Sequence, residues 1–377
     1  MIKILIAGDF CSINRVDFVL KQKKQEEIFR YIIPLIDQHD YSVVNLECPV
    51  VAEGDKPIPK QGPNLSASID TIVALKFAGF KLITLANNHF YDYGENGVRH
   101  TISCCNTFGL DTIGGGDSLN TAKKLKVKKI LEKRIAFINI CEHEFSIATQ
   151  TTGGSNPLNP ISNYYDIQEA KAKADYVIVI VHGGHEHYQL PSPRMQETYR
   201  FFVDIGADVV VNHHQHCFSG YETYKGKPIF YGLGNFCFDN PSKRNTIWNE
   251  GCLLSLCFDE RDNIFALLIP YKQCNEEPTI SLLKGNEKMA FDNKISDLNK
   301  IIEDSCLLRK SFEDFCTSQK RLYLSLFEPY PGRYLKYIYR KGWLPSLLSE
   351  KVKLFAQNFL DCESHYDVMK EVVKMHK

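Results

Sequence analysis

The chain has 377 residues, of which 44% are hydrophobic, and its 45 lysine and arginine residues equal its 45 aspartate and glutamate residues in number. This composition is typical of a globular protein and excludes a disordered or fibrous chain. The zero net charge predicts no nucleic-acid partner, because neutralising phosphates requires a basic excess. At about 100–200 residues per domain, the length predicts two domains or one large α/β domain with an appendage.

The cysteines and the N-terminus predict a cytoplasmic protein. The 13 cysteines form no CxxC pair, and several lie in apolar runs, which favours a reducing compartment over a disulfide scaffold. Met1 leads directly into a strand-like run, and we expect no leader sequence. No stretch of the sequence reaches the roughly 18 apolar residues that a membrane span requires.

Short β-branched runs alternate with longer amphipathic runs along most of the chain. Strands are predicted at 2–7, 42–46, 82–85, 127–131, 135–140, 176–181, 208–211, 228–231, 252–258 and 264–269. Helices are predicted at 26–38, 68–78, 95–108, 168–174 and 192–205. This order predicts an α/β fold with a mostly parallel sheet, because strands that are buried on both faces read as uninterrupted apolar runs.

Polar side chains that can bind a metal follow five of these strands at the points where they end. They are Asp9, Glu47, Asn87, Asn88, His89, His182, His213, His214 and His216. Ligands of open α/β sheets bind outside the carboxyl ends of the strands, so we expect these side chains to converge.

Each of these residues has an ordinary explanation when it is taken alone. Asp9 can cap a turn, Glu47 can be a surface carboxylate, and an isolated histidine such as His182 is usually a hydrogen-bonded core residue. Their joint occurrence at five successive strand ends favours a metal site instead.

The ligand types indicate which metal such a site would bind. Two carboxylates, an amide and several imidazoles suit Mn²⁺, Fe or Zn²⁺, and they contain too much nitrogen for a Ca²⁺ site. Six ligands exceed the need of one tetrahedral ion, so two divalent ions about 3.5–4 Å apart, bridged by a carboxylate, are expected. The corresponding chemistry is metal-assisted hydrolysis or a related transfer.

Short motifs surround these strand ends in a fixed order. They are Gly8-Asp9, Asn45-Leu46-Glu47, Asn87-Asn88-His89 with Asp92-Tyr93-Gly94, His182-Gly183-Gly184 with Glu186, His213–His216, and Gly234-Asn235-Phe236 with Asp239. Together they resemble the CapA family, the capsule-synthesis proteins named for the poly-γ-glutamate capsule. The resemblance covers roughly residues 1–270. It implies a calcineurin-like metallophosphoesterase fold, which is an α/β/β/α sandwich.

The resemblance also implies roles for individual residues. Asp9 matches a ligand of one ion, Glu47 the bridging carboxylate and Asn88 the amide ligand. His182 and His214 would complete the shell of one ion.

The remaining assignments concern the second ion and the catalytic groups. His216 would bind the second ion, and His89 matches the residue that stabilises charge or protonates a leaving group. Asn87 would orient the ligands. Arg15 is a candidate anion clamp, with an exposed arginine at a helix start as the alternative.

The sequence departs from the family pattern at several positions. Cys11 stands where metallophosphoesterases usually carry a histidine ligand, so one ion would lack a ligand or be bound through a thiolate. His213 lies in a variant of the family's Gly-His-His-Pro-His motif and is either structural or a ligand. His185 and His187 either contact substrate, extend the site or line its mouth.

The resemblance ends near residue 285, which predicts a CapA-like domain at 1–285 and a helical C-terminal extension at 286–377. Helical periodicity is present at 292–310 and 313–326. Basic and aromatic residues alternate through 333–343. This segment either packs its aromatic side chains inward in a helix or makes a peripheral contact with a membrane.

The strand-end residues predict a metal-dependent hydrolase or transferase, and the resemblance to the CapA family implies that it acts in capsule or exopolymer biosynthesis, on poly-γ-glutamate or polysaccharide. The expected substrate is an anionic polymer or a small molecule, and other capsule synthesis proteins are expected partners. The alternative is a non-catalytic assembly or binding component of a capsule synthesis complex, with a structural metal site.

Overall fold

The computed structural model of the protein describes residues 1–261 and 263–375. These residues form two compact units, Met1–Arg309 and Lys310–Lys377. The first unit contains two large β-sheets, and the second is helical.

The larger sheet has eight strands and is parallel around its centre. Its order is β16 (Ile280–Leu282), β15 (Ile264–Gln273), β14 (Glu250–Phe258), β1 (Ile2–Cys11), β2 (Tyr41–Leu46), β3 (Leu82–Thr84) and β4 (Asp111–Ile113). The eighth strand, β13 (Asn235–Phe238), pairs in parallel with the end of β1 and places Asn235 beside Asp9. β1 to β4 are parallel, whereas β14, β15 and β16 pair antiparallel.

The second sheet has six strands, in the order β11 (Tyr221–Tyr224), β12 (Lys227–Phe230), β10 (Val209–His213), β9 (Tyr176–His182), β7 (Lys133–Cys141) and β6 (Lys126–Ile130). The four strands β12, β10, β9 and β7 are parallel. β5 (Gly115–Gly116) and β8 (Gly154–Ser155) form a small separate ribbon.

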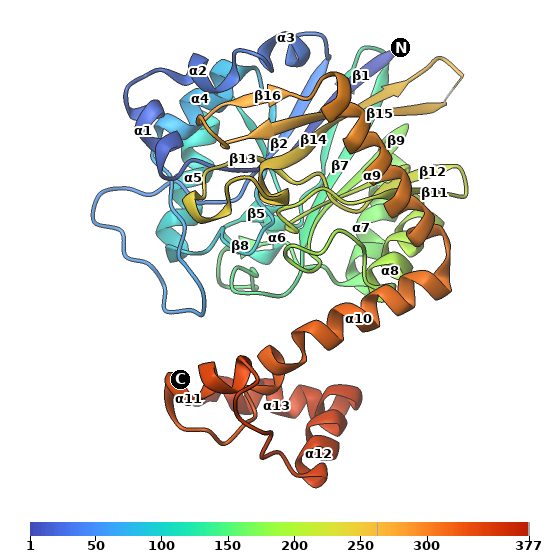
Figure 1. Cartoon of the computed structure of the whole chain (residues 1–377). Helices are drawn as coiled ribbons and strands as arrows, with labels where there is room; N and C mark the ends of the chain where they lie inside the picture. The colour runs from blue at the N-terminus through green and yellow to red at the C-terminus, as the bar shows by residue number, and fades with distance from the viewer. Residues whose placement is uncertain (262, 376–377) are drawn as a thin grey trace. The chain divides into compact units, whose positions relative to one another are not determined.

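The two sheets pack face to face, and helices cover their outer faces (Figure 1). Ile4 and Ile6 of β1 join a hydrophobic cluster with Ile178 and Ile180 of β9, which is the core between the sheets. On the outer face of the larger sheet lie α1 (Arg15–Lys21), α2 (Gln25–Phe29), α3 (Ile33–Ile36), α4 (Asp70–Ala78) and α5 (Gly94–Thr107). On the outer face of the second sheet lie α7 (Pro160–Lys173) and α8 (Pro193–Asp204), and the short α6 (Leu119–Ala122) precedes β6. The predicted α/β/β/α sandwich is confirmed.

Two predicted helices differ from the structure. The helix expected at 26–38 is divided into α2 and α3, because Pro34 has no N–H and its ring clashes with a continuous preceding turn. The helix expected at 168–174 already begins at Pro160. The Asn159 side chain accepts hydrogen bonds from the N–H groups of Ile161 and Ser162, which caps the helix at this earlier point.

The first helix of the predicted C-terminal extension, α9 (Gly285–Glu303), belongs to the first unit. α9 starts at the predicted boundary of residue 285, but its Phe291 and Ile295 join the core between the sheets. Contacts divide the chain later, after Arg309 and within α10 (Ser305–Leu324). The second unit continues with α11 (Gly332–Arg340), α12 (Glu350–Asp361) and α13 (Glu363–Met375). Across residues 1–261 and 263–375, no helix combines the length and the apolar composition that crossing a membrane requires.

Candidate metal centre

The ends of strands from both sheets bring the predicted ligands together. Asp9 lies near the end of β1, Glu47 follows β2 directly, and His182 is the last residue of β9. In the parallel pair β9 and β10, His182 lies opposite His213, so the next residue, His214, enters the same region. All of these side chains are buried.

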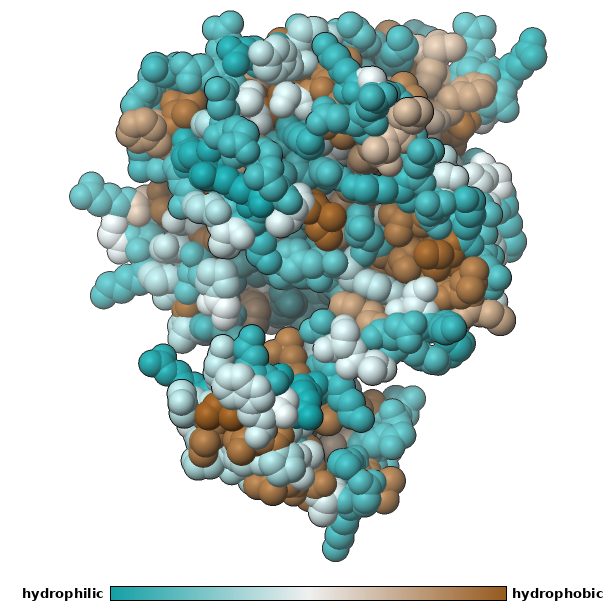
Figure 2. Space-filling view, viewed as in Figure 1, coloured by the Kyte–Doolittle hydropathy of each residue, from teal (hydrophilic) through white to brown (hydrophobic). Residues whose placement is uncertain are grey.

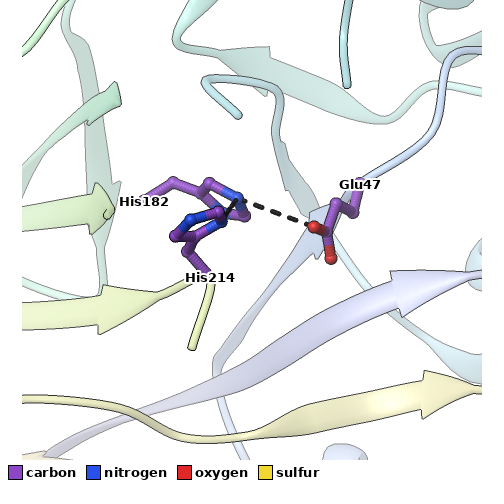
Figure 3. Close-up of side chains that lie close together, drawn as sticks. All are labelled: Glu47, His182 and His214. Atoms are coloured by element: carbon purple, nitrogen blue, oxygen red, sulfur yellow. Dashed lines mark hydrogen bonds and ion pairs between the residues drawn. The ribbon is translucent and has the colours of Figure 1, made fainter. Parts of the chain in front are cut away.

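The side chains form two groups that share one carboxylate. In the first group, ligand atoms of Glu47, His182 and His214 all lie within 4.8 Å of one another (Figure 3). In the second group, the same is true of Asp9, Glu47 and His216. Two ions held by these groups would therefore be bridged by Glu47, as expected for a pair of divalent ions.

Asn88 adds an oxygen to the first group. Its side-chain oxygen lies 3.0 Å from His182 Nε2, and His214 Nδ1 lies 3.1 Å from the same nitrogen. These atoms face a common point, which is the arrangement that an ion with mixed oxygen and nitrogen ligands requires.

Neighbouring amides hold two of the ligands in place. Asp9 accepts hydrogen bonds from Asn45 Nδ2 at 2.7 Å and from the backbone N–H of His214 at 3.0 Å. His216 Nδ1 donates to the side-chain oxygen of Asn235 at 2.9 Å. This bond leaves the Nε2 lone pair of His216 available, as outer hydrogen bonds do for histidine ligands of metals.

The carboxylate of Glu47 tests whether the cluster suits a cation. Its side chain is 0% exposed, and within the described residues neither of its oxygens has a hydrogen-bond partner. A buried carboxylate without a partner is costly, and a bound cation is the common means of satisfying it. The nearest imidazole nitrogens lie 3.5 Å (His216 Nε2) and 3.7 Å (His182 Nε2) from Glu47 Oε1. The donor set therefore fits divalent metal ions.

The pKa values of the cluster indicate the same charge requirement. Burial raises the pKa of Asp9 to about 7, although hydrogen bonds from His214 and Asn45 lower it. Burial and the charge of Asp9 raise the pKa of Glu47 well above its ordinary value. Burial lowers the pKa values of His182 and His216. Ionised carboxylates and neutral imidazoles are the forms that bind metals, so added cations would reverse the shifts of the carboxylates.

The backbone is strained at the same point. His214 and His216 have φ angles of +91° and +55°, and His187 in the neighbouring loop has +62°. Residues other than glycine rarely adopt these angles, and each costs roughly 1–3 kcal/mol. Such strain concentrates at functional sites, where the surrounding structure holds a side chain in the required position.

His89 stands beside the two groups in a hydrogen-bonded chain of its own. His89 Nδ1 lies 2.7 Å from Asp92 Oδ2. Lys60, whose side chain is 2% exposed, forms an ion pair with Asp92 and lies 3.1 Å from His89 Nδ1. The Asn87 side chain accepts from the backbone N–H of His89 and donates to the carbonyl of Leu46. His89 is thus held at Nδ1 by Asp92 and Lys60 and at its backbone N–H by Asn87.

Arg15 lies outside both groups. Its guanidinium donates to the Asp239 carboxylate through Nε and Nη2, and to the backbone carbonyls of Cys274, Asn275 and Glu276. Asp239 is 0% exposed. These contacts support a structural role for Arg15 in joining α1 to the loop after β15, and not the role of an anion clamp.

We expect Arg15→Met to destabilise the protein without changing its metal affinity. The substitution leaves the Asp239 carboxylate buried without its partner, which should lower the unfolding free energy by about 2–4 kcal/mol in urea titrations. Arg99→Met is the matched control, because Arg99 forms an exposed ion pair with Glu95 that is worth under about 1 kcal/mol. Equal effects of the two substitutions would contradict the structural role.

Four further residues were left open by the sequence: Cys11, His185, His187 and His213. The ring of His185 lies 6.4 Å from that of Tyr188, and His185 belongs to neither ligand group. Cys11 is buried in the core beneath the helices, where burial and the Cys48 thiol raise its pKa, and it belongs to neither ligand group. His213 also belongs to neither group; its Nδ1 is 3.8 Å from Asp9 Oδ1. The ring of His187 lies 6.3 Å from that of His216 and 5.7 Å from that of Trp248, and its Nε2 lies 3.5 Å from Lys243 Nζ.

The raised pKa of Asp9 predicts a pH effect on the metal-free protein. A carboxyl group that binds its proton more tightly when folded stabilises the fold at low pH, and this contribution is lost as the pH rises from about 4 to 7. The buried histidines act in the opposite direction, so the comparison is with Asp9→Asn. Relative to this variant, the wild type should lose up to about 1.4 kcal/mol of unfolding free energy per pH unit in chelator. A constant difference between the two proteins across this range would contradict the prediction.

The residues that support the ligands were only partly visible in the sequence. Asn45, Asp92 and Asn235 stand in the quoted motifs, but they had no assigned role. No sequence pattern indicated a role for Lys60, because it is one of several lysines in a loop rich in proline, glycine and lysine.

Comparison with known proteins identifies a family model and several relatives that match the chain. The family model described as "Bacterial capsule synthesis protein PGA_cap" matches residues 3–240. The chain is 34% identical over 293 residues to the capsule biosynthesis protein CapA of Bacillus anthracis, which covers 74% of this chain and 70% of that protein. It is 34% identical over 236 residues to the PGA biosynthesis protein CapA of Bacillus subtilis (strain 168), which covers 62% of each.

Similarity to solved structures is weaker. A phosphatase from Mycoplasma pneumoniae has a TM-score of 0.46 and 14% identity, and the match covers 71% of this chain and 93% of that one. A 5'-nucleotidase from Candida albicans has a TM-score of 0.42 and 12% identity, over 85% of this chain and 58% of that one.

The fold and the site define an α/β sandwich protein with a candidate metal centre where the strand ends of its two sheets meet. The chain belongs to the bacterial capsule synthesis protein family, PGA_cap. The resemblance found in the sequence motifs is confirmed.

Proposed function

We propose that this protein is a metal-dependent hydrolase or transferase in capsule or exopolymer biosynthesis, acting on poly-γ-glutamate, a polysaccharide or a related anionic substrate. The observation that carries the proposal is the carboxylate of Glu47, which is buried, has no hydrogen-bond partner within the described residues, and is shared by two ligand groups. A purely structural carboxylate would be expected to accept hydrogen bonds.

The ligand residues divide between two ions. Glu47, Asn88, His182 and His214 would hold one ion, and Asp9, Glu47 and His216 the other. When bound, the ions (Mn, Fe or Zn) would lower the pKa of a water molecule and neutralise charge that develops on a substrate oxygen.

The protein's own residues would supply the remaining chemistry. His89 directs Nδ1 to Asp92, so its Nε2 is the atom that can protonate a leaving group. Lys60 and Asp92 fix the ring, and Asn87 fixes the backbone of His89. Asn45 and Asn235 keep Asp9 and His216 oriented.

Two measurements test this function. Protein purified without chelator should contain about two transition-metal ions per chain by elemental analysis. Fewer than about one ion per chain would contradict a catalytic metal site and a structural metal site alike. The loaded protein should hydrolyse a generic phosphodiester such as bis(p-nitrophenyl) phosphate, and Asp9→Asn should abolish this activity. A protein that retains its metal but hydrolyses neither phosphodiester nor poly-γ-glutamate would refute the proposed enzymatic activity.

The second candidate function is that of a non-catalytic component of a capsule synthesis complex. It is favoured by one relative, a protein of Mycobacterium tuberculosis named "Probable polyglutamine synthesis accessory protein", which is 24% identical over 218 residues. These residues cover 53% of this chain and 56% of that protein. In this case the metal would be structural: its removal would lower stability, and the metal-loaded protein would hydrolyse neither phosphodiester nor poly-γ-glutamate.

A peripheral membrane contact through 333–343 is part of the proposal. Tyr334, Tyr337 and Trp343 are 74%, 53% and 76% exposed, whereas Tyr339 is buried within the second unit. Figure 2 shows apolar side chains on the visible surface of this unit. Exposed aromatic residues beside Arg333 and Lys336 suit an anionic lipid surface. Flotation with anionic vesicles tests this, and equal flotation of the Tyr334→Ala/Trp343→Ala variant would contradict it.

A further inference from the structure

The outer edge of β15 is open over most of its length. β16 pairs only with Tyr271–Gln273 of β15. In the described ranges 1–261 and 263–375, no strand pairs with the outer edge over residues 264–269. The hairpin of β14 and β15 projects from the first unit (Figure 1).

This edge strand lacks the features that normally prevent an edge strand from pairing with another chain. The sequence from Ile264 to Ile269 is Ile-Phe-Ala-Leu-Leu-Ile, with no charged residue and no proline. Phe265 and Leu267 are 57% and 60% exposed. Natural edge strands are usually short, charged, bulged or covered, and a long apolar edge strand is a site of strand pairing.

The hydrogen bonds of the hairpin show which backbone groups point outward. The N–H of Asp259 donates to the carbonyl of Asn263, so the odd-numbered residues of β15 face β14 in the alternating antiparallel ladder. The even-numbered residues face the open edge, and the carbonyl of Pro270 accordingly accepts from the N–H of Leu283. The unpaired outward groups are therefore those of Ile264, Ala266 and Leu268.

A groove runs along the inner side of this edge. It has a volume of about 500 Å³ and lies between β15 and α9. Its lining includes the apolar Leu268, Phe291 and Ile295 and the charged Lys288, Asp292, Lys300 and Glu303 of α9. Apolar side chains from an added strand would have space to pack there, next to the core between the sheets.

We propose that β15 pairs with β15 of a second copy of this chain, antiparallel and centred on Ala266, so that the larger sheets of two molecules join. A two-fold axis at Ala266 places Ile264 opposite Leu268 of the second copy, and both residues have unpaired outward groups. A centre at Leu267 would place Ile264 opposite Pro270, which has no N–H and whose carbonyl is already used.

A second copy is favoured over an unrelated strand by the symmetry and by the charges. With the axis at Ala266, the outward groups of Ile264, Ala266 and Leu268 all lie opposite outward groups of the same set in the second copy, which is what an isologous interface requires. The strand itself has no charged residue over 264–270, so pairing two copies of β15 brings no like charges opposite each other within the strands. The pair also continues the antiparallel pattern of β14, β15 and β16.

The register makes the interface testable by charge. Phe265 lies opposite Leu267 of the second copy, and both side chains are exposed in the single chain. The full-length protein should be a dimer by light scattering coupled to size exclusion. Phe265→Lys/Leu267→Lys should weaken the dimer at least about tenfold, because lysines then face lysines. Phe265→Glu/Leu267→Lys should restore it, because each new glutamate then faces a new lysine.

A backbone variant provides an independent measurement. Ala266→Pro removes an outward N–H, whereas the ladder with β14 does not use this N–H, so the chain should fold and become monomeric. Circular dichroism and thermal unfolding verify the fold of each variant. A monomeric wild type, a dimer that resists the double-lysine variant, or a failure of the glutamate–lysine variant to restore the dimer would overturn the proposal. None of these results depends on metal binding or hydrolysis.

Discussion

Glu47→Gln is expected to change the stability of the metal-free and metal-loaded proteins in opposite directions. In chelator at pH 8, the substitution removes a buried carboxylate without a hydrogen-bond partner, so the unfolding free energy should rise by about 1–2 kcal/mol. In excess Mn²⁺ or Zn²⁺, the wild type should gain about 4 kcal/mol for each ion at a thousand times its Kd. The variant should lose most of this gain, because Glu47 belongs to both ligand groups. Urea titrations in both conditions measure the crossover.

Glu186→Gln is the matched control for this experiment. The side chain of Glu186 is 52% exposed, and its charge acts on Glu47 only from a distance. Its removal should change stability by no more than about 0.5 kcal/mol in either condition. A Glu47→Gln variant that keeps the full stabilisation by metal would exclude Glu47 as the bridging ligand.

The second large effect is expected at His89. His89→Asn should lower phosphodiester turnover by about 10²–10⁴-fold, the usual contribution of a general acid, while stabilisation by metal is retained. The reason is that His89 belongs to neither ligand group, whereas Asp92 orients its ring. The loss should be largest for substrates with an alkoxide leaving group and smallest for p-nitrophenolate, which leaves without protonation.

A variant of Lys60 distinguishes the positioning of the His89 ring from proton donation by His89. Lys60→Met removes the ammonium group that holds Asp92, and we expect a smaller loss of about 10–100-fold with the same dependence on the leaving group. His100→Asn, on α5, serves as a control histidine and should be silent. A His89→Asn variant that is equally impaired on both kinds of substrate would exclude His89 as the acid.

The convergence of the ligand side chains was predictable from the sequence for a simple physical reason. The carboxyl ends of parallel strands lie at the same edge of a sheet, so polar residues that follow β1 and β2 lie together in the larger sheet, and those that follow β9 and β10 lie together in the second sheet. The two sets meet because the two sheets pack face to face. Glu47 after β2 and His182 at the end of β9 follow this rule. The order of the strands and helices predicted an α/β fold with a mostly parallel sheet, whereas the sandwich was implied by the resemblance to the CapA family.

Tertiary contacts account for what the sequence did not show. Lys60 reaches His89 because its loop is fixed to Asp92, which accepts from the N–H of Leu65 and, through its carbonyl, from that of Ile58. The partner of Arg15 is Asp239, which lies 224 residues further along the chain. Periodicity reports on neighbours within a few residues, so neither contact leaves a local pattern.

The hydrogen bond between Asp9 and the backbone of His214 joins residues that are 205 positions apart. At about 5–20 residues per second, a ribosome completes this interval in roughly 10–40 seconds. For most of that time Asp9 and Glu47 have already been synthesised, whereas the histidines that complete their ligand groups have not. A metal ion that required ligands from both ends of this interval could therefore bind only after the ribosome has passed His216.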